Sequence, residues 1–313
     1  MTLYVGVDVG GTKVLAVAID HDGGVIASAT CPMPGRDVPD AEVERVLVGA
    51  VREAAGGQVP TGVGVAAAGL VDSEGEHVRF AAHLPWRDAP VRRSLADRLS
   101  TPVVLDNDAN CAAYAELVLG AARDASNVVL ITIGTGIGGA LVLGGRLYRG
   151  SQGMAGEFGH MQVVPDGLRC ECGLHGCWEQ YCSGRALERV MRVAVGRHLD
   201  GREVSRLARG GDHVARQAIA SIGTWLGVGA AGLVSAFDPD LVVVGGGVSA
   251  DGDLLMEPAR AALLDSLQGT NRRRVPPLVS AALGREAGAI GAALLARDGR
   301  DGSDRPDAGG VGR

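Results

Sequence analysis

The first thirty residues show the alternation of apolar runs and glycine turns that is typical of a β-meander. Apolar runs at 3–9, 13–20 and 25–30 are separated by the turns GGT and HDGG, which predicts three consecutive strands. Residues 41–55 have apolar side chains at intervals of three and four, which predicts an amphipathic helix. Later in the same half, strands are expected at 62–69 and 103–106, and helices at 89–99 and 109–122.

The order of strand, glycine turn and strand begins again near the middle of the chain. NVVLITI (127–133), GTGIGG (134–139) and ALVLGGRLY (140–148) repeat the arrangement of residues 3–20. An irregular insert rich in glycine and cysteine follows over 149–183. The remaining elements are expected to be helices over 184–236, a strand at 241–249, a helix near 253–265, a strand near 277–282 and a final helix at 285–296.

This repetition predicts an α/β protein of two lobes with a cleft between them. The smaller α/β domain is expected to comprise 1–122, completed by the C-terminal helix 285–297. The larger α/β domain is expected to comprise 123–284, with an irregular loop at 156–183. The tail 298–313 is poor in apolar residues and rich in glycine and aspartate, so we expect it to be disordered.

Composition narrows the class of protein. Hydrophobic residues make up 46% of the 313 positions and charged residues 21%, as in an ordinary globular protein. The formal net charge of -6 gives no reason to expect binding to nucleic acid or to a membrane surface. No signal-peptide pattern and no uninterrupted apolar stretch of about 18 residues is recognisable. A cytoplasmic location, in which thiols stay reduced, is therefore expected.

The glycine turns argue against a dinucleotide site and suggest another kind of phosphate site. GTGIGG (134–139) matches the dinucleotide pattern G-x-G-x-x-G, but a strand follows it where that pattern requires a helix. Glycine turns also let backbone N–H groups approach phosphate oxygens. In DVGGTK, Asp8 could hold Mg²⁺ through water, and Thr12 and Lys13 could reach phosphates. Ordinary tight hairpins are the alternative, but two copies in one chain favour phosphate binding.

CECGLHGCWE (170–179) places three cysteines within eight positions. In a reducing compartment such a cluster is more typical of a metal site or a catalytic group than of disulfides. The spacing C-x-C-x4-C is compatible with zinc, although the usual knuckle is C-x2-C. On spacing alone, His175 and Cys182 compete as further ligands. Cys31 and Cys111 are expected to be small buried hydrophobic residues.

Six motifs in sequence order give the chain a clear resemblance to a known family. DVGGTK, LDNDAN, TIGTGIGG, GEFGH, CECGLHGCWE and GGGV resemble the ROK family of sugar kinases and related repressors, over about residues 5 to 295. The resemblance implies the two-lobed actin/hexokinase-like (ribonuclease H-like) ATPase fold, with a central cleft and a zinc-bound loop. CWEQYCSG (177–184) is most similar to the corresponding segment of bacterial ATP-dependent glucokinases.

The resemblance also implies a role for each matching position. Asp108 would be the general base that accepts the proton of the sugar hydroxyl. The other implied sugar-binding residues are Asn107, Glu157, His160, Glu179, Gly69 and His83. Residues implied to bind ATP, with Mg²⁺ near Asp8, are Asp8, Gly10, Gly11, Thr12, Lys13, Gly134, Thr135, Gly136, Gly245, Gly246 and Gly247. A structural zinc ion would be held by His160, Cys170, Cys172 and Cys177.

The chemistry of phosphoryl transfer suits these residue types. The reaction mainly needs positioning, charge stabilisation and a carboxylate that takes the alcohol proton late. Asp108 is placed where a buried strand meets a helix start, whose positive end would favour the ionised carboxylate; simple helix capping by Asn107 and Asp108 is the alternative. A histidine bound to zinc through one ring nitrogen keeps the other for a sugar hydroxyl, which would link the two sites at His160.

One position departs from the family pattern and leaves the sugar open. The family usually has an asparagine where AAHLPW (81–86) places His83, so the contact to the sugar there is expected to differ. Glucose and ATP are the expected substrates, and another hexose, fructose or an N-acetyl amino sugar is the alternative. A sugar-responsive repressor is disfavoured. Such a repressor needs an N-terminal helix-turn-helix, whereas the phosphate hairpin here begins at residue 3. A homodimer or homotetramer is expected.

Overall fold

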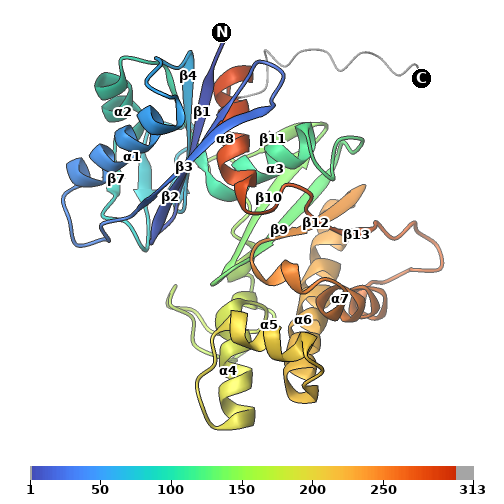
Figure 1. Ribbon diagram of the computed structural model, residues 1–313. Helices are drawn as coiled ribbons and strands as arrows, with labels where there is room; N and C mark the ends of the chain where they lie inside the picture. The colour runs from blue at the N-terminus through green and yellow to red at the C-terminus, as the bar shows by residue number, and fades with distance from the viewer. Residues whose placement is uncertain (1, 301–313) are drawn as a thin grey trace. The chain divides into compact units, whose positions relative to one another are not determined.

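The computed structural model describes residues 2–300, and its α/β class agrees with the prediction (Figure 1). The predicted disordered tail falls largely on 301–313, outside the described residues. The helices are α1 (Asp40–Ala54), α2 (Val91–Leu99), α3 (Asp108–Val118), α4 (Gly184–Val195), α5 (Gly201–Arg209), α6 (His213–Phe237), α7 (Asp253–Ser266) and α8 (Ala287–Asp298).

The N-terminal meander forms one side of the first five-stranded sheet. Its strands are β1 (Tyr4–Val9), β2 (Lys13–Ile19), β3 (Val25–Pro32), β4 (Gly62–Ala67) and β8 (Val103–Asn107), in the spatial order β3-β2-β1-β4-β8. The meander pairs are antiparallel, whereas β1 with β4 and β4 with β8 are parallel. Because β1 and β4 are buried and central, the side chains at their carboxyl ends are held in fixed positions.

The second five-stranded sheet repeats the strand order of the first. Its strands are β9 (Val128–Ile133), β10 (Ile137–Leu143), β11 (Arg146–Tyr148), β12 (Leu241–Gly245) and β13 (Leu278–Ser280), in the order β11-β10-β9-β12-β13. The meander β9-β10-β11 corresponds to β1-β2-β3, and the parallel strands β12 and β13 correspond to β4 and β8. The repeat that the sequence suggested is therefore present in the structure.

Two predicted strands are interrupted, and one small sheet was missed. The expected strand 140–148 is divided between β10 and β11 because Gly144 and Gly145 both have positive φ and form a turn. The expected strand 241–249 ends at Gly245, since Gly246 has φ 88°. The missed three-stranded sheet comprises β5 (Leu70–Val71), β6 (Val78–Phe80) and β7 (Arg87–Ala89), whose strands are too short to show a period.

The chain forms two compact units. Of the described residues, unit 1 holds 2–123, 142–155 and 285–300, and unit 2 holds 124–141 and 156–284. The segment 142–155 thus packs with unit 1, whereas the sequence analysis assigned it to the larger domain. A buried ion pair between Arg149 and Asp106 accounts for part of this packing.

In unit 1, the helix α8 crosses the sheet at very short range (Figure 1). A Cβ atom added to Gly6 of β1 would lie 1.8 Å from the carbonyl oxygen of Ala289, and one added to Gly64 of β4 would lie 1.8 Å from that of Ala292. On the other side of the helix, Gly291 meets the backbone of Cys111 in α3 just as closely. Glycine is therefore required at these three close contacts of α8.

Gly64→Ala should lower the free energy of unfolding by at least about 3 kcal/mol, because the added methyl group forces the backbone of α8 away from the sheet. Gly49→Ala is the matched control: Gly49 lies in α1 with nothing within 4 Å of its Cβ position. That change should be neutral or stabilising by up to about 1 kcal/mol through helix propensity. Chemical denaturation of both variants measures the difference, and equal stability of the two would contradict the tight packing.

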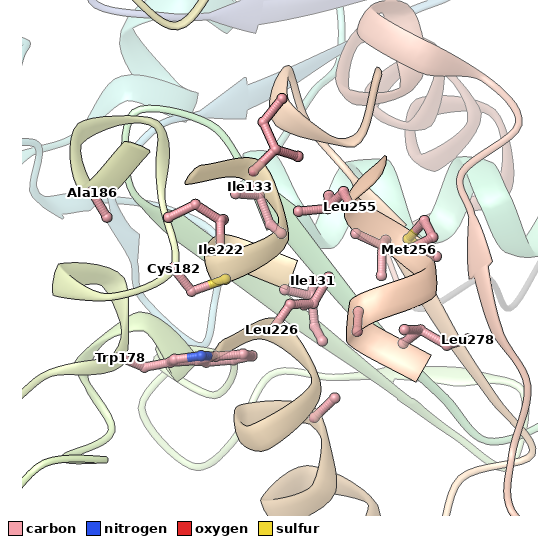
Figure 2. Packing of buried hydrophobic residues seen from close by; sticks show 14 of the residues in the cluster. Ile131, Ile133, Trp178, Cys182, Ala186, Ile222, Leu226, Leu255, Met256 and Leu278 are labelled. Carbon is pink, nitrogen blue, oxygen red and sulfur yellow. The ribbon is translucent and has the colours of Figure 1, made fainter. Parts of the chain in front are cut away.

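The core of unit 2 is built around α6 (Figure 2). Ile222 and Leu226 of α6 lie among Ile131 and Ile133 of β9 and Leu255 of α7, all fully buried or nearly so. By length and hydropathy α6 is the single helix in the described part of the chain that could cross a bilayer. Because 61% of its most apolar window is buried inside the protein, this hydropathy is that of a core helix.

Candidate active site and metal centre

The first glycine turn joins β1 to β2 and carries four of the predicted ATP-binding residues. The N–H group of Gly10 donates to the carbonyl oxygen of Lys13 over 3.1 Å, which closes the turn. Gly11 is half-buried, whereas Thr12 and Lys13 are exposed. The turn therefore presents a hydroxyl group and a cationic side chain at the surface of unit 1, where they are accessible to a phosphate group.

Asp8 lies in β1 directly before this turn and is partly buried. A Cβ atom added to Gly288, at the start of α8, would lie 2.9 Å from Oδ2 of Asp8, so the helix start approaches the carboxyl group closely. Burial, and to a lesser extent the negative charge of Asp108, raise the pKa of Asp8 to about 7, against an opposing effect of Lys13. The ionised Asp8 is thus unfavourable without a cation, and a divalent ion would offset both burial and repulsion.

We expect Asp8→Asn to stabilise the free protein at pH 8 by roughly 2 kcal/mol, a value reduced for the partial exposure of the group. A carboxyl group with a raised pKa in the folded state contributes stability below about pH 4, and this contribution is lost as the pH rises through 7. The side chain at position 8 of the variant is neutral at every pH, so the stability of the variant relative to wild type should decrease as the pH falls towards 4.

Thermal melting between pH 4 and pH 8, without nucleotide or magnesium, measures this difference. Asp37→Asn is the control, because the Asp37 side chain is 95% exposed. A difference between wild type and Asp8→Asn that does not change with pH would contradict the raised pKa.

His83 lies against the first glycine turn. A Cβ atom added to Gly11 would lie 2.6 Å from the Cβ of His83. The loop that carries His83 is held by the guanidinium group of Arg87, which donates to the backbone oxygens of Ala81 (2.7 Å), Leu84 (3.0 Å) and Trp86 (2.7 Å). His83 itself is exposed. The predicted sugar contact therefore belongs to a rigid loop next to a predicted phosphate turn.

The junction of β8 and α3 carries Asn107 and Asp108. Oδ1 of Asn107 caps the helix by accepting from the N–H groups of Ala109 (2.8 Å) and Asn110 (3.2 Å). Its Nδ2 donates to the carbonyl oxygen of Gly69 over 3.1 Å, which joins two predicted sugar residues. Asp108 is the first residue of α3, and its Oδ1 accepts from the N–H of Ala109 over 2.9 Å. The capping that the sequence allowed is present, and it fixes the orientation of Asp108.

The second glycine turn, in unit 2, is also closed by a backbone hydrogen bond. The N–H of Gly134 donates to the carbonyl oxygen of Gly136 over 3.0 Å, with Thr135 between them. The carboxylate of Glu179 lies on this turn: a Cβ atom added to Gly136 would be 2.4 Å from its Oε2. The same oxygen accepts from the N–H of Ile137 at 3.4 Å. A predicted sugar ligand and a predicted phosphate turn are therefore in direct contact.

A cluster of one histidine and three cysteines lies beside Glu179. The ligand atoms of His160, Cys170, Cys172 and Cys177 are all within 4.8 Å of one another. Cys172 Sγ and Cys177 Sγ are 3.6 Å apart, and Cys170 Sγ is 3.7 Å from His160 Nδ1. Tetrahedral zinc with bonds of about 2.3 Å separates two sulfur ligands by roughly 3.8 Å, so these four atoms fit the ion.

The two rival ligands are not part of this cluster. Cys182 is fully buried in the apolar core of unit 2 beside Trp178 (Figure 2). Burial raises the pKa of the Cys182 thiol, which disfavours the thiolate that a metal requires. His175 is not among the four grouped residues either. Of the alternatives left open by spacing, the structure brings His160 to the three cysteines.

Glu157 lies close to the ring nitrogen of His160 that faces away from the cysteines. His160 Nε2 is 3.9 Å from Oε2 of Glu157. Burial raises the pKa of Glu157, while His160 lowers it and Glu179 raises it. His160 can therefore bind a metal ion through Nδ1 and a polar group through Nε2. Glu157 and Glu179 provide two further carboxylates in the same unit.

Trp178 is a functional residue that sequence reasoning missed. It lies between the ligand Cys177 and Glu179, is fully buried, and donates from Nε1 to the carbonyl oxygen of Trp225 over 2.7 Å. Its ring fills the space that a Cβ atom on Gly229 of α6 would occupy. Trp178 thus anchors the irregular loop in the core (Figure 2). The signal was a large aromatic residue inside a metal motif, in a chain with only 3% aromatic residues.

The glycines 245–247 follow β12 in unit 2. Gly246 has φ 88°, and a Cβ atom added there would lie 2.4 Å from the carbonyl oxygen of Ile133. Nothing lies within 4 Å of the Cβ position of Gly247, so this side of the turn is open. The turn therefore has exposed backbone without side chains, which a planar base could approach.

The predicted site residues are divided between the two units. Unit 1 holds those around the first glycine turn and the β8–α3 junction, which are Asp8, Gly10, Gly11, Thr12, Lys13, Gly69, His83, Asn107 and Asp108. Unit 2 holds the second turn, the glycines 245–247, the metal cluster and its acidic neighbours, which are Gly134, Thr135, Gly136, Glu157, His160 and Glu179. Their functional roles remain predictions.

Comparison with known proteins places these features in a family. The ROK family model matches residues 4–299. A glucokinase of Streptomyces coelicolor is 41% identical over 95% of this chain and 98% of the relative. The crystal structure of a ROK family glucokinase from Streptomyces griseus in complex with glucose and AMPPNP is 39% identical, with a TM-score of 0.87 over 95% of this chain and 100% of that one. A putative xylose repressor of Caldicellulosiruptor is 32% identical over 82% of this chain and 69% of the relative.

Proposed function

Because the chain belongs to the ROK family, we propose that it is an ATP-dependent glucokinase, which transfers the γ-phosphoryl group of ATP to the 6-hydroxyl of glucose. The observation that carries this proposal is the similarity, over nearly the whole of both chains, to a glucokinase whose structure contains glucose and an ATP analogue. The metal cluster, the two glycine turns and the aspartate at the β8–α3 junction support it.

Asp108 is the general base of the proposed reaction. Its backbone is fixed by the first turn of α3, and its carboxylate lies at the helix start, where positive charge favours the ionised form. The bond from phosphorus to the leaving oxygen of ADP breaks and a new bond forms between phosphorus and the 6-oxygen of glucose; as this bond forms, the hydroxyl becomes more acidic and its proton passes to the Asp108 carboxylate. Asn107 and Gly69 keep the carboxylate in place through their mutual hydrogen bond.

The proposed glucose ligands are hydrogen-bond donors and acceptors. Sugar hydroxyls donate and accept hydrogen bonds, so they suit the second N–H of the Asn107 amide and the carboxylates of Glu157 and Glu179. His160 adds its Nε2 atom. His83, in place of the family's amide, contributes a ring nitrogen from the loop at the first turn.

ATP is bound by the glycine turns, with magnesium near Asp8. The proposed phosphate ligands are backbone N–H groups of the glycine turns, Thr12 and Lys13, and the proposed surface for the base is the open turn after β12. Mg²⁺, when bound, neutralises charge on the β- and γ-phosphate oxygens. The pair of carboxylates at Asp8 and Asp108 fits a hard divalent cation, since each raises the energy of the other's ionised form.

Zinc is proposed as a structural ion bound by His160, Cys170, Cys172 and Cys177. All four positions are protein ligands, so no site is left for a reacting water molecule, as is usual for structural zinc. The ion would connect the 3₁₀ turn that carries His160 (Phe158–His160) to the loop that carries Glu179. It would thereby set the positions of Glu157 and Glu179, which flank the cluster.

The decisive experiment is a coupled assay of the purified protein with ATP and magnesium against glucose, N-acetylglucosamine, N-acetylmannosamine and fructose. Glucose should give the highest kcat/KM. If an N-acetyl amino sugar or fructose is preferred, the kinase class stands and the sugar is wrong. The histidine at position 83, where the family usually has asparagine, is the specific observation that favours such another sugar. The absence of turnover with every sugar would refute the proposed kinase activity.

Location and assembly are further parts of the proposal. The six cysteines are free of disulfides, as is typical of a reducing cytoplasm. The net charge of -6 gives no support for nucleic-acid binding. Val193 and Val195 of α4 are exposed apolar residues, which suits an interface in a homodimer or homotetramer. Light scattering coupled to gel filtration measures the mass, and a monomer would contradict the proposed assembly.

A further inference from the structure

A buried ion pair lies directly behind the strand end that carries the proposed base. Both Nε and a terminal nitrogen of Arg149 are 2.7 Å from Oδ2 of Asp106. The Asp106 side chain is 1% exposed and that of Arg149 10%. Asp106 precedes Asn107 and Asp108 by one and two residues, and nothing in the proposed mechanism uses its carboxylate. A charged pair at such burial is weak evidence of a contribution to stability, because apolar residues often replace such pairs without loss.

The other oxygen of Asp106 is bound to the start of α3. Oδ1 accepts from the backbone N–H of Asn107 over 2.8 Å and from Nδ2 of Asn110 over 2.9 Å. Asn107 in turn caps the helix through Ala109 and Asn110. The two oxygens of one carboxylate thus have separate partners: Oδ1 holds the first turn of α3, and Oδ2 holds Arg149 at 2.7 Å, with Nε of Arg300 further away at 3.7 Å.

Arg149 is itself held by the backbone at two points. Its NH2 group donates to the carbonyl oxygen of Arg300 over 2.6 Å, and its own carbonyl oxygen accepts from the N–H of Ala155 over 3.0 Å. The guanidinium group is therefore fixed on the segment 142–155 and by the chain just after α8. It cannot follow Asp106 if the β8–α3 junction moves.

We propose that Arg149 is a positioning residue for phosphoryl transfer, which acts through Asp106 to hold Asp108 in the orientation that accepts the sugar proton. This inference rests on the proposed function, since it assigns Asp108 the role of base. With both oxygens of Asp106 fixed, the backbone N–H of Asn107 and the first turn of α3 have a single arrangement. Asp108 is one residue further along, so the arrangement of this turn sets the orientation of its side chain. A misplacement of about 1 Å at such a group can cost on the order of 10²-fold in rate.

Three variants separate positioning from simple stability. Arg149→Met removes the close ion pair and leaves the buried carboxylate with the more distant Arg300, whose Nε lies 3.7 Å from Oδ2. The double variant D106N/R149M removes both charges and keeps Oδ1 as an acceptor for Asn107 and Asn110, so its stability should recover. Arg149→Lys keeps the charge and loses the fork that reaches Oδ2 through two nitrogens.

The control is Arg98→Met. It breaks another ion pair of unit 1, in which Arg98 Nε lies 2.8 Å from Oε2 of the buried Glu44, between α2 and α1. Neither residue has a part in the proposed site. If the loss of kcat in Arg149→Met results only from removing an arginine from a buried carboxylate, Arg98→Met should show an equal loss.

Steady-state kinetics and amide hydrogen exchange test the proposal together. We expect kcat to fall at least tenfold in Arg149→Met and to stay reduced in D106N/R149M, with KM for glucose and ATP within about threefold of wild type. The kcat of Arg149→Lys should lie between those of the wild type and Arg149→Met. Exchange of the N–H groups of Ala109 and Asn110 should accelerate at least tenfold in the first two variants, and Arg98→Met should change neither property.

Wild-type kcat in D106N/R149M would overturn the proposal, because the pair would then contribute stability alone. A wild-type protein that phosphorylates no hexose would instead refute the proposed function. In that case the exchange measurement decides: unchanged exchange at Ala109 and Asn110 in the double variant would still overturn the positioning role.

Discussion

Asp108→Asn should lower kcat for glucose phosphorylation by about 10³-fold, within the range for loss of a general base, while the dissociation constant for glucose changes less than about threefold. The amide keeps an oxygen that can accept from the N–H of Ala109, so the first turn of α3 should remain intact. What is lost is the ability to take the hydroxyl proton. Asp108→Ala should give the same loss in kcat.

Asp40→Asn is the matched control, because Asp40 is also the first residue of a helix, α1. It removes the same charge from a helix start in unit 1 without touching the site. Kinetic assays give kcat, and titration calorimetry gives glucose affinity. If Asp108→Asn retains more than a tenth of the wild-type kcat, the proton goes elsewhere and Asp108 is not the base.

Cys172→Ala should remove about one zinc ion per chain and lower the melting temperature by 10 °C or more, because the free energy of structural zinc binding is part of the free energy of folding. Cys172 is exposed, so truncation of its side chain costs little packing. The loss of stability would therefore report the loss of the metal. Chelation of the wild-type protein should reproduce it, together with weaker glucose binding through Glu157, His160 and Glu179.

Cys182→Ala provides the converse control. Cys182 is fully buried in the core beside Trp178, so its truncation should destabilise through packing by about 1 kcal/mol yet leave the zinc content unchanged. Metal analysis by mass spectrometry and thermal melting distinguish the two variants. The four residues are not a zinc site if the purified wild-type protein contains no zinc, or if Cys172→Ala still contains one zinc ion per chain.

Most of the regular elements follow from the sequence because their residues face a core. The helix predicted at 41–55 is α1, at Asp40–Ala54, and the strand predicted at 3–9 is β1, at Tyr4–Val9. Errors occur where glycine decides the backbone: Gly144 and Gly145 turn the chain inside an expected strand. They also occur where strands are as short as β5, whose stability comes from its neighbours and not from its own pattern.

The candidate site was predictable as motifs and not as contacts. Spacing alone left His160, His175 and Cys182 as possible partners for the three cysteines, and only the fold shows that His160 reaches them. Arg149 has no motif at all, since an arginine in an irregular segment is usually solvated. Its pairing with Asp106 spans 43 residues of sequence and exists because the segment 142–155 packs with unit 1.

By itself, the sequence determined the α/β class, the repeated strand order, the family and the residue types available for chemistry. These depend on local pattern and on short motifs, which act within a few residues of one another. The tertiary structure alone decided which histidine joins the cysteines, that Glu179 lies on a glycine turn, and that a buried arginine holds the strand end before Asp108. Such contacts join segments that are distant in the chain, and burial makes them specific because a buried charge or ligand must meet its partner at hydrogen-bonding distance.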